Sequence, residues 1–133
     1  MSAYSEVTTQ FKDGDLLIEA LTAMGFTPRN CIGKPDHLEG YHGDQREQVA
    51  DIIIPRKQVG GVSNDIGFVK GPDGTYRAII SDYDSTRYNG KWINEVKTNV
   101  ADLGIQKQAK RMGLLLGERK VVKGQIQYEY LRA

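Results

Sequence analysis

A short turn sequence, Gly71-Pro72-Asp73-Gly74, most strongly constrains the fold of this chain. Proline presets a backbone φ that suits the second position of a turn, and glycine accepts the positive φ that can follow. The turn lies between two β-forming runs, residues 65–70, centred on Ile66 and Phe68, and residues 75–82, whose side chains alternate. Two such runs around a tight turn predict an antiparallel hairpin.

Two other segments have the periodicity of amphipathic helices. The first follows a candidate N-cap, Asp13, and ends where Gly25 can adopt a left-handed conformation. Its apolar positions are Leu16, Leu17, Ala20, Leu21 and Met24. The second begins at Tyr88 or Asn89 and continues to about Met112, with Gly113 as its end.

The second helical segment carries two apolar stripes rather than one. The first stripe is expected to be core and consists of Trp92, Val96, Val100 and Leu103. The second, formed by Ile105, Ala109 and Met112, falls on roughly the opposite face. A straight helix cannot bury both stripes in one core, so we predict a break or kink near Gly104.

The remaining β-forming runs are shorter, and turn residues or prolines separate them. They are residues 3–11, 29–32, 38–43 running into a turn, 47–54 ended by Pro55, and a closing hairpin of 114–119 and 125–131 turned by 121–124. The element order β-α-β-β-β-β-α-β-β predicts an α+β fold, in which two helices pack on one face of a mostly antiparallel sheet. The other face would be left to solvent or to a partner.

Length and composition favour one cytoplasmic, water-soluble domain spanning residues 1–133. The chain has 133 residues and a formal charge of +1, so no general electrostatic field draws it to nucleic acid or membranes. Its single cysteine, Cys31, cannot form an intramolecular disulfide. The first residues lack the basic and apolar regions of a signal peptide, and no apolar run is long enough to span a membrane.

Several motifs resemble the hypothetical chloroplast reading frame 35 family, a domain of unknown function found in cyanobacteria, red-algal plastids, other bacteria and phages. The similar segments are Ser2 to Thr9 ("SHFSxxxT" in the family), the helix ending at Gly25-Phe26, Gly40-Tyr41-His42-Gly43 ("GYxG"), Asn64-Asp65-Ile66-Gly67-Phe68 ("YDIGF"), and Asp82. Val100-Ala101-Asp102 replaces a tyrosine-alanine-tyrosine cluster, a tryptophan near the end is missing, and the 55–63 loop is longer.

The resemblance implies an α+β fold and a location in bacterial cytosol, in host cytosol if the protein is phage-encoded, or in plastid stroma. It implies no catalytic residue, because the family has no established activity.

Gly40-Tyr41-His42-Gly43 raises the question of catalysis, since His42 has Asp44 and Glu47 nearby in sequence. A histidine paired with a carboxylate can act as a general base. The spacing of the glycines instead favours a turn, with the ring of Tyr41 packed against the sheet and His42 solvated. We therefore predict no catalytic residue here.

Two groups of side chains are candidate metal ligands. Cys31, His37 and His42 are zinc-ligand types, but their spacing matches no standard zinc motif. Asp82 and Asp84 would face the same way on a strand and, with Asp65, could hold magnesium. Acidic residues at a strand end more often cap the next helix, so neither a metal nor another cofactor is predicted.

Two further groups could bind phosphate or nucleic acid. Residues 85–91 lie at a predicted helix N-terminus, where Arg87 and Lys91 could hold an anion, although they do not form a P-loop. The closing hairpin carries the ingredients for stacking on single strands, namely Arg119, Lys120, Lys123, Tyr128 and Tyr130. The balanced net charge argues against nucleic acid.

These patterns favour a non-catalytic binding or accessory module, with a protein or a small phosphorylated ligand as its partner. The alternative is a small nucleotide-binding or phosphorylated-signal-sequestering protein, which could be phage-encoded, and an enzyme of unknown type is third. The oligomeric state, including a homodimer, is left open. The predicted ligand-binding residues are Tyr41, His42, Arg46, Asp65, Asp82, Arg87, Tyr88 and Lys91.

Overall fold

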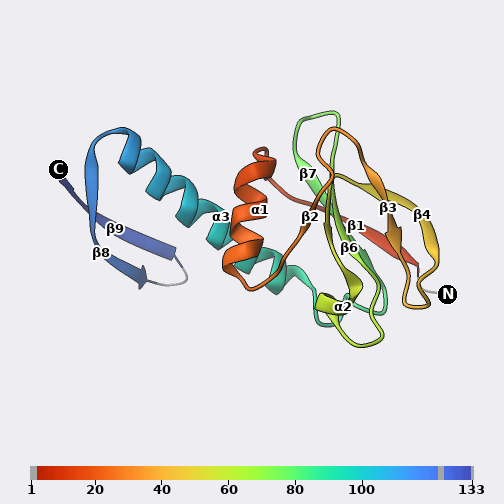
Figure 1. Ribbon diagram of the computed structural model, residues 1–133. Coiled ribbons are helices and arrows are strands. Elements are labelled where there is room, and N and C mark those ends of the chain that lie inside the picture. The colour runs from red at the N-terminus through yellow and green to blue at the C-terminus, as the bar shows by residue number, and fades with distance from the viewer. Residues whose placement is uncertain (1–2, 123–124, 133) are drawn as a thin grey trace.

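The computed structural model describes residues 3–122 and 125–132, with side chains described for residues 3–113. Its centre is a five-stranded sheet in which every neighbouring pair is antiparallel (Figure 1). In spatial order its strands are β1 (Tyr4–Thr8), β7 (Tyr76–Ser81), β6 (Ile66–Lys70), β5 (Ile52–Ile54) and β2 (Arg29–Asn30). The predicted α+β class is confirmed.

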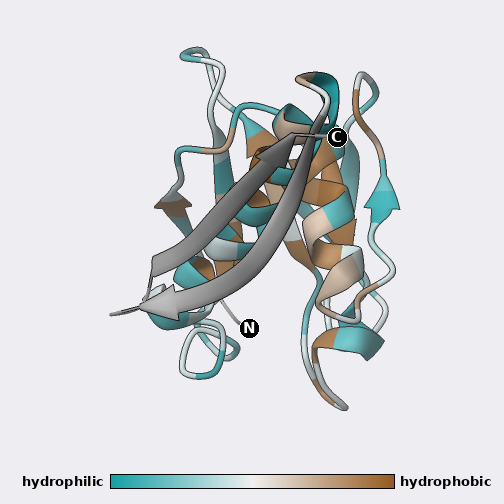
Figure 2. Ribbon diagram, turned by 90° about the vertical axis from the view of Figure 1, so that its left-hand side faces the viewer, coloured by the Kyte–Doolittle hydropathy of each residue, from teal (hydrophilic) through white to brown (hydrophobic). Residues whose placement is uncertain are grey.

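Two helices, α1 (Gly14–Ala23) and α3 (Gly90–Arg111), cover one face of this sheet (Figure 1). The main core lies between them and the sheet, and hydrophobic residues gather there at the centre of the body (Figure 2). Its members include Leu17 and Leu21 from α1, Phe68 from β6, and Trp92 and Val96 from α3. The expected core position of the first α3 stripe is therefore confirmed for Trp92 and Val96.

The opposite face of the sheet is also covered, contrary to the sequence-based prediction. A separate hairpin of β3 (Asp36–Glu39) and β4 (Gln45–Ala50) lies over it (Figure 1). Leu38 and Ala50 from this hairpin form a second apolar cluster with Ile53 and Ile79 from the sheet. The hairpin approaches closely because β6 has a glycine there: a Cβ on Gly67 would lie 2.7 Å from the Cβ of Ala50.

The strand predicted at residues 47–54 is two strands that belong to different sheets. β4 ends at Ala50, and β5 begins at Ile52. Asp51 separates them, with its backbone N–H donating to Phe68 O at 2.9 Å and its carboxylate accepting from Lys70 N at 2.8 Å. These bonds place Asp51 at the point where the chain passes from the hairpin layer to the central sheet. The prediction of one continuous strand was wrong.

The predicted break near Gly104 is also wrong, because α3 is helical from Gly90 to Arg111. Its first part packs on the central sheet and α1, whereas its later part leaves the body and contacts the closing hairpin of β8 (Leu114–Val122) and β9 (Gln125–Arg132) (Figure 1). One continuous helix thus contacts two different elements, and its second stripe is only partly covered, since Ala109 is buried whereas Met112 is 62% exposed. Val121 and Val122 belong to β8 rather than to a turn, and the rest of the predicted turn lies outside the described residues.

Local signals for the ends of elements are confirmed. The carboxylate of Asp13 accepts a hydrogen bond from Leu16 N at 3.1 Å, and Gly25 has a φ of 100°. In the β6–β7 turn, Gly74 has a φ of 82° and its N–H donates to Gly71 O at 3.0 Å. A one-turn helix, α2 (Arg56–Val59), was not predicted. No helix among the described residues is both long and apolar enough to cross a membrane.

Candidate functional site

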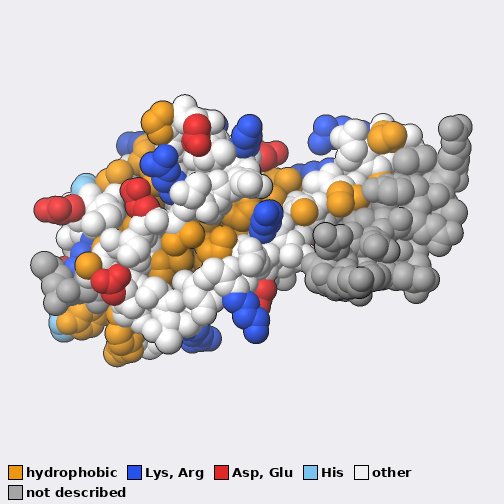
Figure 3. All heavy atoms as spheres, turned by 180° about the vertical axis from the view of Figure 1, so that it is seen from behind, with side chains coloured by type: hydrophobic (Ala, Val, Ile, Leu, Met, Phe, Trp, Pro, Cys, Tyr) orange, Lys and Arg blue, Asp and Glu red, His pale blue; other side chains and the backbone are white. Residues whose placement is uncertain are grey.

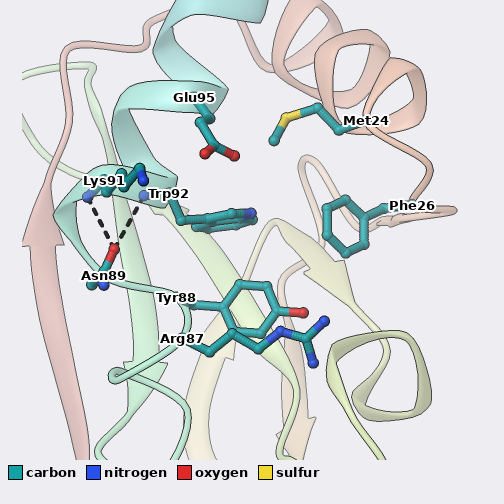
Figure 4. A pocket seen from close by; sticks show the side chains of 8 residues that line it. All are labelled: Met24, Phe26, Arg87, Tyr88, Asn89, Lys91, Trp92 and Glu95. Carbon is teal, nitrogen blue, oxygen red and sulfur yellow. Dashed lines mark hydrogen bonds between the residues drawn. The ribbon is translucent and has the colours of Figure 1, made fainter.

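The surface is hollowed where the start of α3 meets the end of α1 (Figure 4). This cavity, the α3 pocket, has a volume of about 330 Å³. It is lined by Met24, Phe26, Arg87, Tyr88, Asn89, Lys91, Trp92 and Glu95. Arg87, Tyr88 and Lys91 are residues for which the sequence predicts ligand binding, and the structure brings all three to one cavity.

The aromatic side of the α3 pocket is held rigidly. The Trp92 ring lies edge-to-face with Tyr88, 5.0 Å between centroids, and with Phe26, 6.1 Å between centroids. Trp92 and Tyr88 are both buried, and the Tyr88 hydroxyl donates to Val59 O at 2.8 Å. Burial raises the pKa of Tyr88, which keeps this hydroxyl protonated as a donor. The wall is therefore in place without a ligand, which lowers the entropy that binding must offset.

Two cations lie at the α3 pocket, and neither forms an ion pair within the described part of the chain. The Arg87 guanidinium carbon lies 5.5 Å from the centroid of the Tyr88 ring, and its Nη1 donates to Val59 O over a long 3.5 Å. Lys91 and Glu95 line the cavity from α3. Figure 4 shows the Glu95 carboxylate and the Arg87 guanidinium on opposite sides of the Trp92 ring. The pocket thus offers one cation, Arg87, at one end of the aromatic wall, and Glu95 together with Lys91, one helical turn apart on α3, at the other end.

Three backbone amides at the start of α3, those of Lys91, Trp92 and Ile93, already have acceptors. The Asn89 side chain accepts from Lys91 N at 3.0 Å and from Trp92 N at 3.3 Å, as the dashed lines in Figure 4 show. The first turn contains no acidic residue, so the helix dipole remains unopposed there. An anion near residues 85–91 would therefore bind through the side chains of Arg87 and Lys91, rather than through amides as the sequence-based hypothesis supposed.

A second cavity of about 560 Å³ continues from the α3 pocket along α3. The two cavities share Met24, Lys91 and Glu95. The second is lined in addition by Ala23, Asn94, Thr98 and Asn99. Together they form a groove between the end of α1 and the first half of α3, so the site can extend beyond a ligand that fills the α3 pocket.

Tyr41 and His42, two further predicted site residues, lie in the β3–β4 turn rather than at the α3 pocket. The turn is closed by Gly43 N donating to Gly40 O at 2.8 Å, and Gly43 has a φ of 80°. The rings of Tyr41 and His42 lie 3.9 Å apart, and Tyr41 is exposed rather than packed against the sheet. The prediction of a turn is confirmed. No hydrogen bond joins His42 to a carboxylate among the described residues.

Arg46 is buried beneath this turn. Its Nε lies 3.1 Å from Asp44 Oδ2 without the alignment of a hydrogen bond, and its Nη2 donates to Asn64 Oδ1 at 3.4 Å. The guanidinium carbon lies 5.9 Å from the ring centroid of Tyr4, and burial raises the pKa of Tyr4 to about 12. A Cβ on Gly40 would lie 2.3 Å from Arg46 Nε. Arg46 therefore shapes the turn from inside and is not available to a ligand.

Asp65 also has a structural position. Its carboxylate accepts hydrogen bonds from Glu39 N at 2.8 Å and Arg56 N at 2.7 Å. Burial raises the pKa of Asp65, although these two bonds act in the opposite direction. Asp65 thereby joins the end of β3 to the start of α2. It holds two segments together beside the turn rather than facing a ligand.

Asp82 and Asp84 do not form the pair of parallel carboxylates that a strand would produce. β7 ends at Ser81, after which Asp82 is exposed and Asp84 is buried. Asp82 accepts from Ser5 Oγ at 3.3 Å, whereas Asp84 Oδ2 accepts from Asn64 N at 3.0 Å and Ser81 Oγ at 2.8 Å. Among the described residues, no group of three or more His, Cys, Asp or Glu side chains is placed to hold a metal ion.

Sequence reasoning missed Asn64, whose side chain joins the β3–β4 turn to the end of β7. Its side chain is fully buried, accepts from Tyr41 N at 3.0 Å and donates to Ser81 Oγ at 3.0 Å. Asn64 thus connects the β3–β4 turn with the segment after β7. No local pattern marks such a residue, because its partners are far away in sequence.

The predicted site residues therefore separate into two groups. Arg87, Tyr88 and Lys91 line the α3 pocket, whereas Tyr41, His42, Arg46, Asp65 and Asp82 lie around the turn and network at the end of the sheet. Comparison with known proteins found no matching family model, curated protein or solved structure. The resemblance to the hypothetical chloroplast reading frame 35 family thus stays a prediction.

Proposed function

We propose that this protein is a non-catalytic binding module and that the α3 pocket holds its ligand, a small phosphorylated molecule with a flat ring, such as a nucleoside phosphate. The observation that carries this proposal is the placement of Arg87 and Lys91, two cations without ion-pair partners among the described residues, at a rigid wall of aromatic rings. If the family resemblance holds, the module acts in bacterial or host cytosol or in plastid stroma.

The pocket dimensions and chemistry support a ligand of this class. Small-molecule sites usually have volumes of about 300–1,000 Å³, and the α3 pocket, at about 330 Å³, lies at the lower end. Stacking of a base on an aromatic side chain contributes about 1–3 kcal/mol, and Phe26 is the partly exposed ring of the wall that can take part in it. Arg87 and Lys91 supply donors for a phosphate, and the Glu95 carboxylate can accept from amino groups on a ring. Such a ligand would place its phosphate at the Arg87 end of the aromatic wall and an amino group of its ring at the Glu95 end.

The roles of the lining groups support binding rather than catalysis. The Tyr88 hydroxyl donates to Val59 O, and the Asn89 carbonyl oxygen caps α3. In the described lining, no hydrogen bond pairs a nucleophile with a base, the arrangement that nucleophilic catalysis requires. The polar groups of this pocket therefore serve to position a ligand or to hold the helix.

A thermal-shift titration tests the proposal. A ligand that binds only the folded protein raises its melting temperature, by an amount that grows with ligand concentration. Adenosine and guanosine monophosphates should raise it, whereas inorganic phosphate or the free nucleosides should produce smaller shifts, because each supplies only part of the contacts. Equal shifts from phosphate alone would contradict the role of the aromatic wall.

Charge-removing variants locate the site. Arg87→Gln and Lys91→Gln should each weaken nucleotide binding, by about 1 kcal/mol or less where the contact stays exposed, because solvent screens charges on exposed residues such as these. Lys97→Gln is the matched control, because Lys97 is exposed on the same helix and does not line either cavity. No shift with any nucleotide, or equal losses in all three variants, would refute the α3 pocket as a phosphate site.

A further inference from the structure

A third cavity lies at the end of the sheet, on the other side of Arg87 from the α3 pocket. This loop cavity has a volume of about 300 Å³ and is lined by Gly60, Gly61, Val62, Ser63, Tyr83, Asp84, Thr86 and Arg87. It is formed by the loop after α2 and the segment after β7, which lie side by side in Figure 1. Only Arg87 is shared with the α3 pocket, so the loop cavity is a distinct site.

A buried carboxylate with an unused oxygen lies in this cavity. Asp84 is only 4% exposed, and its Oδ2 accepts both of the hydrogen bonds that its carboxylate receives among the described residues. Its Oδ1 accepts no hydrogen bond from the described residues and is not fully enclosed. Since Asp84 lines the loop cavity, this oxygen is placed to accept a hydrogen bond from a group that enters it.

Two apolar side chains project at the same cavity. Tyr83 is 58% exposed and Val62 is 59% exposed, so both offer apolar surface to a group that enters the cavity. The segments are ordered because Asn64 N and Ser81 Oγ both donate to Asp84 Oδ2. Val62 and Tyr83 are therefore held in place before a partner binds, which reduces the conformational entropy that is lost on binding.

The charges around the loop cavity favour a cation. Asp82, beside Tyr83, is exposed, and Asp84 contributes a second carboxylate. Arg87 is the cation on the wall, and its guanidinium lies beside the Tyr88 hydroxyl in Figure 4, toward the α3 pocket. The lining thus has one carboxylate, Asp84, and one cation, Arg87; because the Arg87 guanidinium lies toward the α3 pocket, the carboxylate of Asp84, with exposed Asp82 nearby, is left to attract a second cation. An exposed tyrosine ring beside that charge can also attract a cation to its face.

We propose that the loop cavity receives an arginine side chain from a partner protein. The guanidinium donates to Asp84 Oδ1 and stacks on the Tyr83 ring, while its methylene groups contact Val62. Arginine fits better than lysine, because its planar group can bond to a carboxylate and lie against an aromatic ring at once. The loop cavity is therefore a protein-docking site, independent of the ligand proposed for the α3 pocket.

Nuclear magnetic resonance titration tests this inference with two matched probes, N-acetyl-arginine N-methylamide and its uncharged citrulline analogue. The arginine probe should shift the amides of Gly60, Gly61, Ser63 and Thr86 in a saturable way, and the citrulline probe should bind severalfold more weakly. Equal shifts from both probes, shifts confined to other residues, or no shift would overturn the proposal.

Variants identify the two contacts separately. Tyr83→Ala should weaken binding of the arginine probe about two- to fivefold, the effect of an exposed cation–π contact. Tyr41→Ala removes another exposed tyrosine that does not line the cavity, and it should leave binding unchanged. Asp84→Asn should abolish the preference for arginine over citrulline. If Asp84→Asn does not fold, the contrast between Tyr83→Ala and Tyr41→Ala still decides the question, because both change exposed side chains.

Discussion

Replacing Asn64 with alanine tests whether the buried polar network orders the end of the sheet. The Asn64 side chain makes three hydrogen bonds, accepting from Tyr41 N at 3.0 Å and Arg46 Nη2 at 3.4 Å and donating to Ser81 Oγ at 3.0 Å. Alanine removes all three in a residue that has no exposed surface. It also leaves the buried Arg46 guanidinium without its amide partner.

The size of the loss follows from these contacts. A neutral hydrogen bond contributes about 0.5–1.5 kcal/mol, and loss of a partner from a buried charged group costs more. Because the three bonds share one side chain and are not additive, we expect the free energy of unfolding to fall by about 2–4 kcal/mol. For a chain of this length, that loss lowers the melting temperature by on the order of 10 °C.

Urea denaturation of wild type and Asn64→Ala measures the free-energy difference, with Asn94→Ala as the control. Asn94 is exposed on α3, so its replacement should change the free energy of unfolding by no more than about 0.5 kcal/mol. Amide shifts of the folded variant should change in the β3–β4 turn and in residues 81–88. A loss below about 0.5 kcal/mol, similar to that of the control, would refute the claim that this network holds the loops.

Three further predictions concern other contacts. Gly67→Ala should destabilise the protein by about 1–3 kcal/mol in urea denaturation, because the new Cβ would lie 2.7 Å from the Cβ of Ala50. Gly61→Ala is the control and should be nearly neutral, because a Cβ at that position has no neighbouring atom within 4 Å. Asn89→Ala should reduce stability by about 0.5–2 kcal/mol and lower helicity measured by circular dichroism, through loss of the α3 cap. Because the pKa of Asp65 is raised, this carboxyl binds a proton more tightly in the folded protein than in the unfolded chain. The free energy of unfolding of wild type should therefore rise relative to that of Asp65→Asn as the pH falls from neutral through the raised pKa. A difference between the two free energies that stays constant with pH would contradict this.

The candidate site was partly predictable, and its residues show why. Arg87, Tyr88 and Lys91 could be grouped from sequence because they are close together at the start of a recognisable helix. Met24 and Phe26 join them only because α1 ends beside α3 in the folded chain. Trp92 was expected to be core, and it is, but the same ring also lines the α3 pocket. A periodic pattern identifies the buried face of a helix without showing where that face meets the surface.

The sequence by itself determined the features that depend on a few neighbouring residues. Asp13 caps its helix, Gly25 and Gly74 adopt positive φ, and the turn at residues 71–74 joins β6 to β7, all as predicted. These features follow from backbone preferences and hydrogen bonds within one turn of chain, so distant residues have little influence on them.

Only the tertiary structure decided the features that depend on distant partners. Asp51 divides one predicted strand because it bonds to β6, and α3 continues through Gly104 while it contacts both the body and the closing hairpin. Arg46 and Asn64 became structural residues because their partners come from separate segments of the chain. Burial of a polar group is favourable only when its partners are in place, and the fold alone brings those partners together.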